Sequence, residues 1–146
     1  MGLMQRTKGK VFERKIAALL RQRWPEAVVR RASQAERAHN PDVFVERGPG
    51  WLSGIWLELQ DARNPNPRAK LEQAERDIIA SIDPLRDAII VWHRLAEHAI
   101  WATLRTGAYL RLLRSSGRMI EDQHNALVTM EIDDLLDVVE AAQRSG

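Results

Sequence analysis

The sequence predicts a single α/β domain in which helices flank a central mixed sheet. Three observations support this prediction. Segments with apolar residues at helical spacing alternate with short apolar runs of strand length. One pair of runs is joined by a short glycine- and proline-containing connection, whereas the next run follows a helical segment. A length of 146 residues suits one domain with a substantial core.

The first half of the chain predicts a helix followed by a three-strand meander. Apolar residues recur at helical spacing over residues 7–24, and Pro25 ends the pattern. The connection at residues 47–54 has the glycines and proline of a hairpin, so its flanking strands are expected to be antiparallel. The three strands are expected over residues 27–33, 42–46 and 55–61.

A second helix and a central strand are expected next. Asn66 suits an N-cap and Pro67 the first helical position, while Asp83–Pro84 ends the helix. The run Ala88–Trp92 is continuously apolar, as expected of a strand covered on both faces and reached by a helical crossover. The buried stripe of the helix is expected to comprise Leu71, Ala74, Ile78 and Ile82.

The last third of the chain predicts two strand-helix units that extend a core of about residues 7–92. Residues 98–113 and 124–139 resemble each other, and each reads as a short strand leading into an amphipathic helix. Together they form extensions over residues 98–143. The first helix is basic and the second acidic, so the last helix is expected to face away from any DNA. Capping the sheet, closing a dimer and docking a partner protein are its candidate roles.

Composition restricts the chemistry that is available. The chain has no cysteine, and its four histidines lack zinc-site spacing, so any metal must be held by oxygen ligands. It contains neither an apolar stretch of about 20 residues nor a secretory signal, which leads us to expect a soluble protein without a membrane partner.

Charge is distributed unevenly along the chain. Residues 1–40 carry 10 Lys/Arg against 3 Asp/Glu, whereas residues 119–146 carry 1 against 7. A basic end and an excess of arginine over lysine favour contact with a phosphate backbone. The alternative is that the arginine excess reflects genome composition or heat adaptation.

Two acidic residues stand where neighbouring strands meet. Glu58 and Gln60 are two apart on one strand and therefore share a face, which is expected to be the one where the first helix packs. Asp42 opens the adjacent strand, and the hairpin should bring it near Glu58. Two such carboxylates suit Mg²⁺. Glu13, at the margin of the buried stripe of the first helix, is a third candidate ligand.

The segments KGKVFERK, VVRRAS and PDV and the strand ending in ELQ resemble one known family. This family is the archaeal-type Holliday-junction resolvases of the PD-(D/E)xK nuclease superfamily, in a phage or prokaryotic version, and the resemblance covers about residues 7–92. It implies a restriction-endonuclease-like sheet and a homodimer that cuts branched or duplex DNA with Mg²⁺ or Mn²⁺. It also implies a role in DNA recombination and repair, in the cytoplasm of a prokaryotic or phage-infected cell.

The resemblance assigns roles to several residues. Asp42 and Glu58 match the two metal-binding acids, and Glu13 matches the glutamate of the first helix, which would act through a water or directly. Arg14, Arg30 and Ser33 match further positions of the family motifs. The residues expected to contact DNA phosphates are Arg6, Lys8, Lys10, Arg14, Arg30, Arg31 and Ser33.

One position departs from the family pattern, because Gln60 stands where the motif lysine is expected. Glutamine can position a water but brings no charge, which would slow chemistry by about 10²-fold. Lys70 is a candidate substitute. Gln73, in the block LEQAERD, matches a glutamine of RecB-like nucleases, although Asp77 replaces the aromatic residue expected there. The alternatives are a catalytically weak or inactive DNA-binding member, and an α/β interaction module whose acids coincide by chance.

The tryptophans are expected to contribute to the core or a dimer contact rather than to stack on bases. The four that this expectation concerns are Trp51, Trp56, Trp92 and Trp101.

Overall fold

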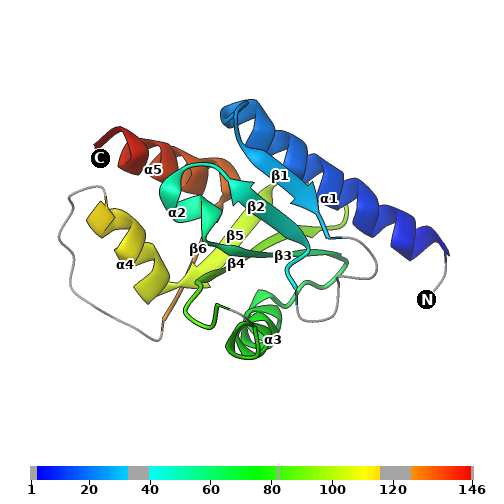
Figure 1. The fold of residues 1–146 in the computed structure, drawn as a ribbon. Helices are drawn as coiled ribbons and strands as arrows, with labels where there is room; N and C mark the ends of the chain where they lie inside the picture. Colours follow the sequence, from blue (N-terminus) through cyan, green and yellow to red (C-terminus); the bar gives the residue numbers. More distant parts are fainter. Residues whose placement is uncertain (1–2, 33–39, 82, 116–125, 146) are drawn as a thin grey trace.

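The computed structural model describes residues 3–32, 40–81, 83–115 and 126–145, which form one six-stranded mixed sheet flanked by helices (Figure 1). The strands lie in sequence order across the sheet, from β1 to β6. The predicted α/β class is therefore confirmed. Among the described residues, no helix is long and apolar enough to cross a membrane.

The predicted helix and antiparallel meander are confirmed. The helix is α1 (Leu3–Arg23), and the strands are β1 (Val28–Arg31), β2 (Val43–Arg47) and β3 (Trp56–Ala62). The connection between β2 and β3 is more than a hairpin turn, because it contains the short helix α2 (Gly50–Ser53). Leu52 of α2 is buried in the core, so its apolar side chain accounts for the extra turn of helix.

The predicted crossover is also confirmed. Helix α3 (Pro67–Ile79) begins as expected, since the Asn66 side chain accepts a hydrogen bond from the Ala69 N–H at 3.1 Å. Strand β4 (Ala88–Arg94) then pairs in parallel with β3 along its whole length. Leu71, Ala74 and Ile78 are buried as predicted. Ile82, the fourth member of the predicted stripe, lies outside the described residues.

Both strand-helix units predicted in the last third of the chain are present. Strand β5 (Ile100–Arg105) leads into α4 (Thr106–Ser115), and β6 (Leu127–Glu131) leads into α5 (Ile132–Ser145). Strands β5 and β6 pair antiparallel with their neighbours and so continue the same sheet.

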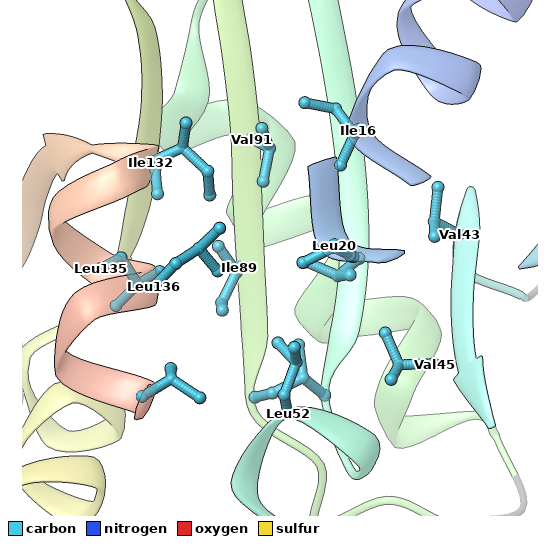
Figure 2. Close-up of a cluster of buried hydrophobic side chains, with 14 of the residues drawn as sticks. Ile16, Leu20, Val43, Val45, Leu52, Ile89, Val91, Ile132, Leu135 and Leu136 are labelled. Atoms are coloured by element: carbon cyan, nitrogen blue, oxygen red, sulfur yellow. The ribbon is translucent and has the colours of Figure 1, made fainter. Parts of the chain in front are cut away.

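Two apolar clusters lie on opposite faces of the sheet. The larger cluster joins α1, α2, α4 and α5 to one face, with Leu20, Val91 and Leu136 near its centre (Figure 2). The smaller cluster joins α3 to the other face through Trp56, Ile90 and their neighbours. Because side chains alternate along a strand, Leu57 and Leu59 of β3 belong to the larger cluster and Trp56 to the smaller one.

The tryptophans lie mainly in or against this core, as predicted. Trp56 is fully buried, and Trp51 and Trp92 pack against the two clusters. The rings of Trp92 and Trp101 stack with their centroids 6.1 Å apart. The core part of the prediction is therefore confirmed, and the dimer contact stays a prediction.

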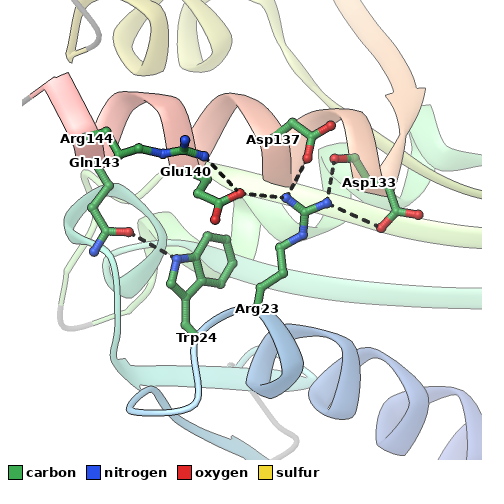
Figure 3. A network of polar contacts seen from close by, with 7 residues as sticks. All are labelled: Arg23, Trp24, Asp133, Asp137, Glu140, Gln143 and Arg144. Atoms are coloured by element: carbon green, nitrogen blue, oxygen red, sulfur yellow. Dashed lines mark hydrogen bonds and ion pairs between the residues drawn. The ribbon is translucent and has the colours of Figure 1, made fainter.

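The basic end of α1 contacts the acidic helix α5 (Figure 3). The Arg23 guanidinium lies 2.6 Å from the Asp137 carboxylate, 3.3 Å from that of Glu140 and 3.8 Å from that of Asp133. Beside it, the Trp24 indole N–H donates to the Gln143 side chain at 3.1 Å. Helix α5 therefore covers the sheet beside α1, which is the capping role among the three roles left open for the acidic helix.

Replacing Arg23 with glutamine is expected to lower the free energy of unfolding by about 1 kcal/mol, because three carboxylates lose their counter-charge. The effect is small because the Asp133 and Asp137 side chains are 68% and 65% exposed and water screens them. Urea unfolding followed by circular dichroism measures the change. Arg144→Gln is the matched control, since the Arg144 side chain is 73% exposed in its pair with Glu140. An equal loss in both variants would contradict a specific role for Arg23.

Candidate functional site

Glu58 faces α3 and not α1. It alternates with Leu57 and Leu59, which belong to the cluster packed under α1, and it shares its face with Trp56 in the cluster under α3. The expectation that Glu58 lies where the first helix packs was therefore wrong. Glu58 does alternate with buried leucines, as expected. However, α1 covers the face that carries these leucines, and α3 covers the opposite face, which carries Glu58.

Asp42 is held in place by the strands on either side of it. Its N–H donates to the Leu57 carbonyl at 3.1 Å, and its own carbonyl accepts from the Ala32 N–H at 3.0 Å. Its carboxylate Oδ2 accepts from the Leu59 N–H at 2.9 Å. The backbone of β3 thus fixes the Asp42 carboxylate next to the segment that carries Glu58.

The Asp42 and Glu58 carboxyl groups interact directly. Glu58 is buried, with 8% of its surface exposed. This burial, together with the charge of Asp42 and a hydrogen bond to it, raises the pKa of Glu58 to about 8. The predicted meeting of the two acids at adjacent strands is thus present, and in the metal-free protein the pair holds a proton at neutral pH.

Two donors oppose this rise in pKa and fix the Glu58 carboxyl. The Lys70 Nζ lies 3.5 Å from Oε2, and the Trp56 indole N–H donates to Oε1 at 2.8 Å. Both contacts favour the ionised form of Glu58. An ammonium from α3 therefore lies at the acid pair, although β3 carries Gln60 where the motif has lysine.

Gln60 links the site to the start of α3. Its side-chain carbonyl accepts a hydrogen bond from the backbone N–H of Asn66, the N-cap residue of α3, at 3.0 Å. This bond anchors the helix end that carries Lys70. Gln73 lies elsewhere on α3, where it accepts from Arg76 at 2.8 Å and donates to Asp77 at 3.3 Å along the helix surface. No described contact brings Gln73 to the acid pair.

Glu13 is buried as expected for an inward-facing glutamate, with 5% of its surface exposed. Its carboxylate lies 3.6 Å from the Arg31 guanidinium, and Arg31 pairs with Val43, the residue after Asp42. Glu13 is thus near the strand that follows Asp42. Within the described parts of the chain, however, no three acidic or histidine side chains are grouped so that they could hold a metal.

The residues expected to contact DNA divide into three groups. Lys10 and Arg14 are exposed on α1. Arg30 and Arg31 already have acidic partners, since Arg30 pairs with Glu46 and Arg31 with Glu13. Ser33 lies outside the described residues, and the structure does not describe the side chains of Arg6 and Lys8.

The acid pair has the donors that a hard divalent cation requires. Mg²⁺ is commonly bound through one or two carboxylates, with water and substrate phosphate oxygens completing its shell. Asp42 and Glu58 supply two carboxylates, and burial beside the charge of Asp42 raises the pKa of Glu58, so a cation between them would be favourable. The residues present therefore fit Mg²⁺ or Mn²⁺.

A second polar pair lies at the ends of the parallel strands on the opposite face of the sheet. His93 Nδ1 lies 2.9 Å from Asp61 Oδ1, and Nε2 bonds the Glu97 carbonyl. The hydrogen bond with Asp61 is the main cause that raises the pKa of His93. No motif in the sequence marks this pair, although Asp61 directly follows Gln60 and the parallel register of β3 and β4 aligns it with His93.

His93 is expected to make stability depend on pH. Since its folded pKa lies above the unfolded value of about 6.5, its contribution is fully present below that value and is lost as the pH rises through the folded pKa. Urea unfolding of wild type and His93→Gln between about pH 5 and about pH 9 isolates this contribution as the difference between the two curves. A difference that stays constant over this range would contradict the assignment. Asp61→Asn should remove the same pH dependence.

Comparisons with known proteins do not extend this description. The chain matches no protein-family model, and neither curated proteins nor solved structures give a significant match. The fold and the site together define an α/β protein that presents a buried glutamate and a half-buried aspartate beside a lysine.

Proposed function

We propose that this protein is a metal-dependent, structure-selective DNA endonuclease with a restriction-endonuclease-like fold that hydrolyses phosphodiester bonds in branched DNA, Holliday junctions in particular. The observation that carries the proposal is the Asp42–Glu58 pair with Lys70 beside it. A carboxyl group whose pKa is shifted by burial and by a specific charged neighbour, as that of Glu58 is, is characteristic of functional sites. The resemblance of the surrounding segments to junction resolvases supports the choice of substrate.

In this proposal each residue of the site has a separate task. Asp42 and Glu58 hold Mg²⁺ or Mn²⁺, which when bound polarises the phosphate and lowers the pKa of a water. Lys70 supplies the positive charge that the motif lysine would otherwise bring, and thereby stabilises charge that develops on the phosphate. The side-chain amide of Gln60 orients a water, while its carbonyl holds the N-terminus of α3.

The exposed basic residues of α1, a helix on the other face of the sheet from Glu58, would bind the DNA backbone. Lys10 and Arg14 are exposed there and suit phosphate contacts that do not read sequence. A four-way junction presents two symmetry-related strands, so paired incisions favour a two-fold symmetric homodimer.

A second function is favoured by one specific contact. The carbonyl oxygen of Gln60 is already bonded to the Asn66 N–H, and no lysine occupies its position on β3. This arrangement favours a DNA-binding protein of the same fold with weak or no catalytic activity. DNA binding is common to both functions, so cleavage distinguishes them.

The proposal is tested with an end-labelled four-way junction, incubated with the wild-type protein and Mg²⁺, with a linear duplex of the same sequence as the control. Paired incisions in the junction alone are the expected result. A gel shift without incision, in Mg²⁺ and in Mn²⁺, would favour the non-cleaving function. Binding that is absent even at low salt would reject both functions.

Lys70→Gln is expected to slow junction cleavage by about 10²-fold, because the site would lose the charged donor that Lys70 offers to the developing phosphate charge. Single-turnover rates measure this loss, and Lys70→Arg should recover part of the rate. Arg63→Gln, an exposed charge change before α3, is the matched control. Equal rates for Lys70→Gln and wild type would exclude Lys70 as the substitute for the motif lysine.

A further inference from the structure

A second candidate site lies on the same side of the sheet as Glu58. It is a cavity of about 530 Å³ bounded by α3, the start of β4, the end of β5 and α4. The volume falls in the range of small-molecule sites, which is roughly 300–1,000 Å³. Neither the acid pair nor Lys70 lines this cavity, so it is distinct from the candidate metal site.

Charged residues line the cavity, and arginines outnumber acids. Two of its arginines neutralise both of its acids. Arg105 binds Glu75 through two hydrogen bonds of 2.7 and 3.0 Å, and Arg111 binds Asp87 through its Nε at 2.9 Å and through Nη2. The remaining two arginines, Arg68 and Arg86, give the cavity a net positive charge.

Arg86 is held in a fixed position. Its guanidinium carbon lies 4.9 Å from the ring centre of Trp56, which is fully buried. Its polar contacts are long, at 3.4 Å to the Ser81 hydroxyl and 3.5 Å to the Asp83 carbonyl. A guanidinium has five N–H donors, so Arg86 retains donors for a ligand.

Arg68 faces the cavity from the first turn of α3. It is exposed and forms no described ion pair, so its charge is not neutralised by a described neighbour. Two guanidiniums, one fixed and one adaptable, suit a group that offers several anionic oxygens. A phosphate offers such oxygens and matches the planar fork of arginine.

Apolar residues form the rest of the cavity wall. Leu71, Ala88 and Ala108 are buried and line it together with Gly107. Such a wall favours a ligand that carries an apolar surface beside its phosphate, as the sugar and base of a nucleotide do.

We propose that this arginine cavity, lined by Arg68, Arg86, Arg105 and Arg111, binds the phosphate group of a nucleotide, either free or within a DNA strand. Its position favours proximity to the acid pair, because Arg86 packs on the ring of Trp56 and the indole N–H of Trp56 bonds Glu58. Occupancy of the cavity does not require the protein to cleave DNA.

The test is calorimetric titration of the full-length protein with deoxyadenosine monophosphate and with pyrophosphate at constant ionic strength. Saturable binding is expected, and Arg68→Gln and Arg86→Gln should each weaken it by about tenfold, the usual effect of losing one charge-assisted hydrogen bond. Arg47→Gln, an equal change of charge at the exposed end of β2, should have no effect. Absence of binding, or equal weakening by Arg47→Gln and Arg68→Gln, would overturn the proposal.

Competition distinguishes the two sources of phosphate. If the cavity takes a phosphate of DNA, pyrophosphate should compete for it and displace a labelled duplex from the wild-type protein. The Arg68→Gln variant should bind less duplex, and pyrophosphate should not displace what remains bound. If it takes a free nucleotide, duplex and pyrophosphate should bind together. Because Arg68 is exposed on α3, its substitution should leave folding intact, which thermal unfolding of each variant checks.

Discussion

Glu58→Gln and Asp42→Asn are each expected to reduce Mg²⁺-dependent cleavage of a four-way junction by at least about 10³-fold. Each change would remove one of the two carboxylates proposed to hold the metal, and a bound metal would supply several kcal/mol of transition-state stabilisation. Binding of the junction should persist, because the exposed basic residues are unchanged. Cleavage rates under single-turnover conditions and gel shifts measure the two effects separately.

Glu72→Gln is the matched control for these changes. Glu72 is an exposed glutamate on α3 that lies outside the acid pair, so its variant should cleave within about threefold of the wild-type rate. Wild-type rates in Glu58→Gln or Asp42→Asn would remove the acid pair from the chemistry. Activity lost together with folding would be recognised from the circular dichroism of each variant.

The same substitution, Glu58→Gln, is expected to stabilise the metal-free protein. The folded pKa of Glu58, about 8, lies above its ordinary value of 4.5. Its contribution to stability is therefore fully present below about pH 4.5 and is lost as the pH rises through about 8. At about pH 8 the glutamine variant should be more stable by on the order of 2 kcal/mol, and near pH 4 the two proteins should differ little.

Mg²⁺ should reverse this difference in stability. On the proposed function the ion would bind the folded wild type and stabilise it by mass action, whereas Glu58→Gln would lack one of the proposed ligands. Urea unfolding at about pH 4 and about pH 8, with and without Mg²⁺, measures the free energy of unfolding in each case. A Glu58→Gln variant that is less stable than wild type at pH 8 without metal would contradict the conclusion that burying the Glu58 carboxylate lowers the free energy of unfolding.

Most of the fold could be predicted because local signals agreed with the tertiary structure. The continuous apolar run at Ala88–Trp92 is buried on both faces in β4, and Asn66–Pro67 starts α3 through the expected cap. The crossover and the meander follow from the order of the elements. Helix α2 was not predicted, because its four residues are too few to show a helical period.

The candidate site was only partly predictable. Alternation shows that Glu58 and Gln60 share a face, but it does not show which helix covers that face. The contact between Lys70 and Glu58 depends on the angle at which α3 crosses the sheet, which no local pattern encodes. Glu13 was correctly expected to point inward, yet its partner Arg31 could not be identified from spacing alone. The arginine cavity joins α3, β4, β5 and α4, and no sequence motif links them.

The central claim is that Asp42 and Glu58 form a binding site for a divalent cation. Titration of the protein with Mn²⁺, followed by electron paramagnetic resonance of the free ion, tests this claim without requiring any DNA. We predict one Mn²⁺ per chain for wild type and for Glu72→Gln, no binding to Glu58→Gln, and release of about one proton per ion at neutral pH, because the acid pair holds a proton there. Equal Mn²⁺ binding by wild type and Glu58→Gln would contradict it.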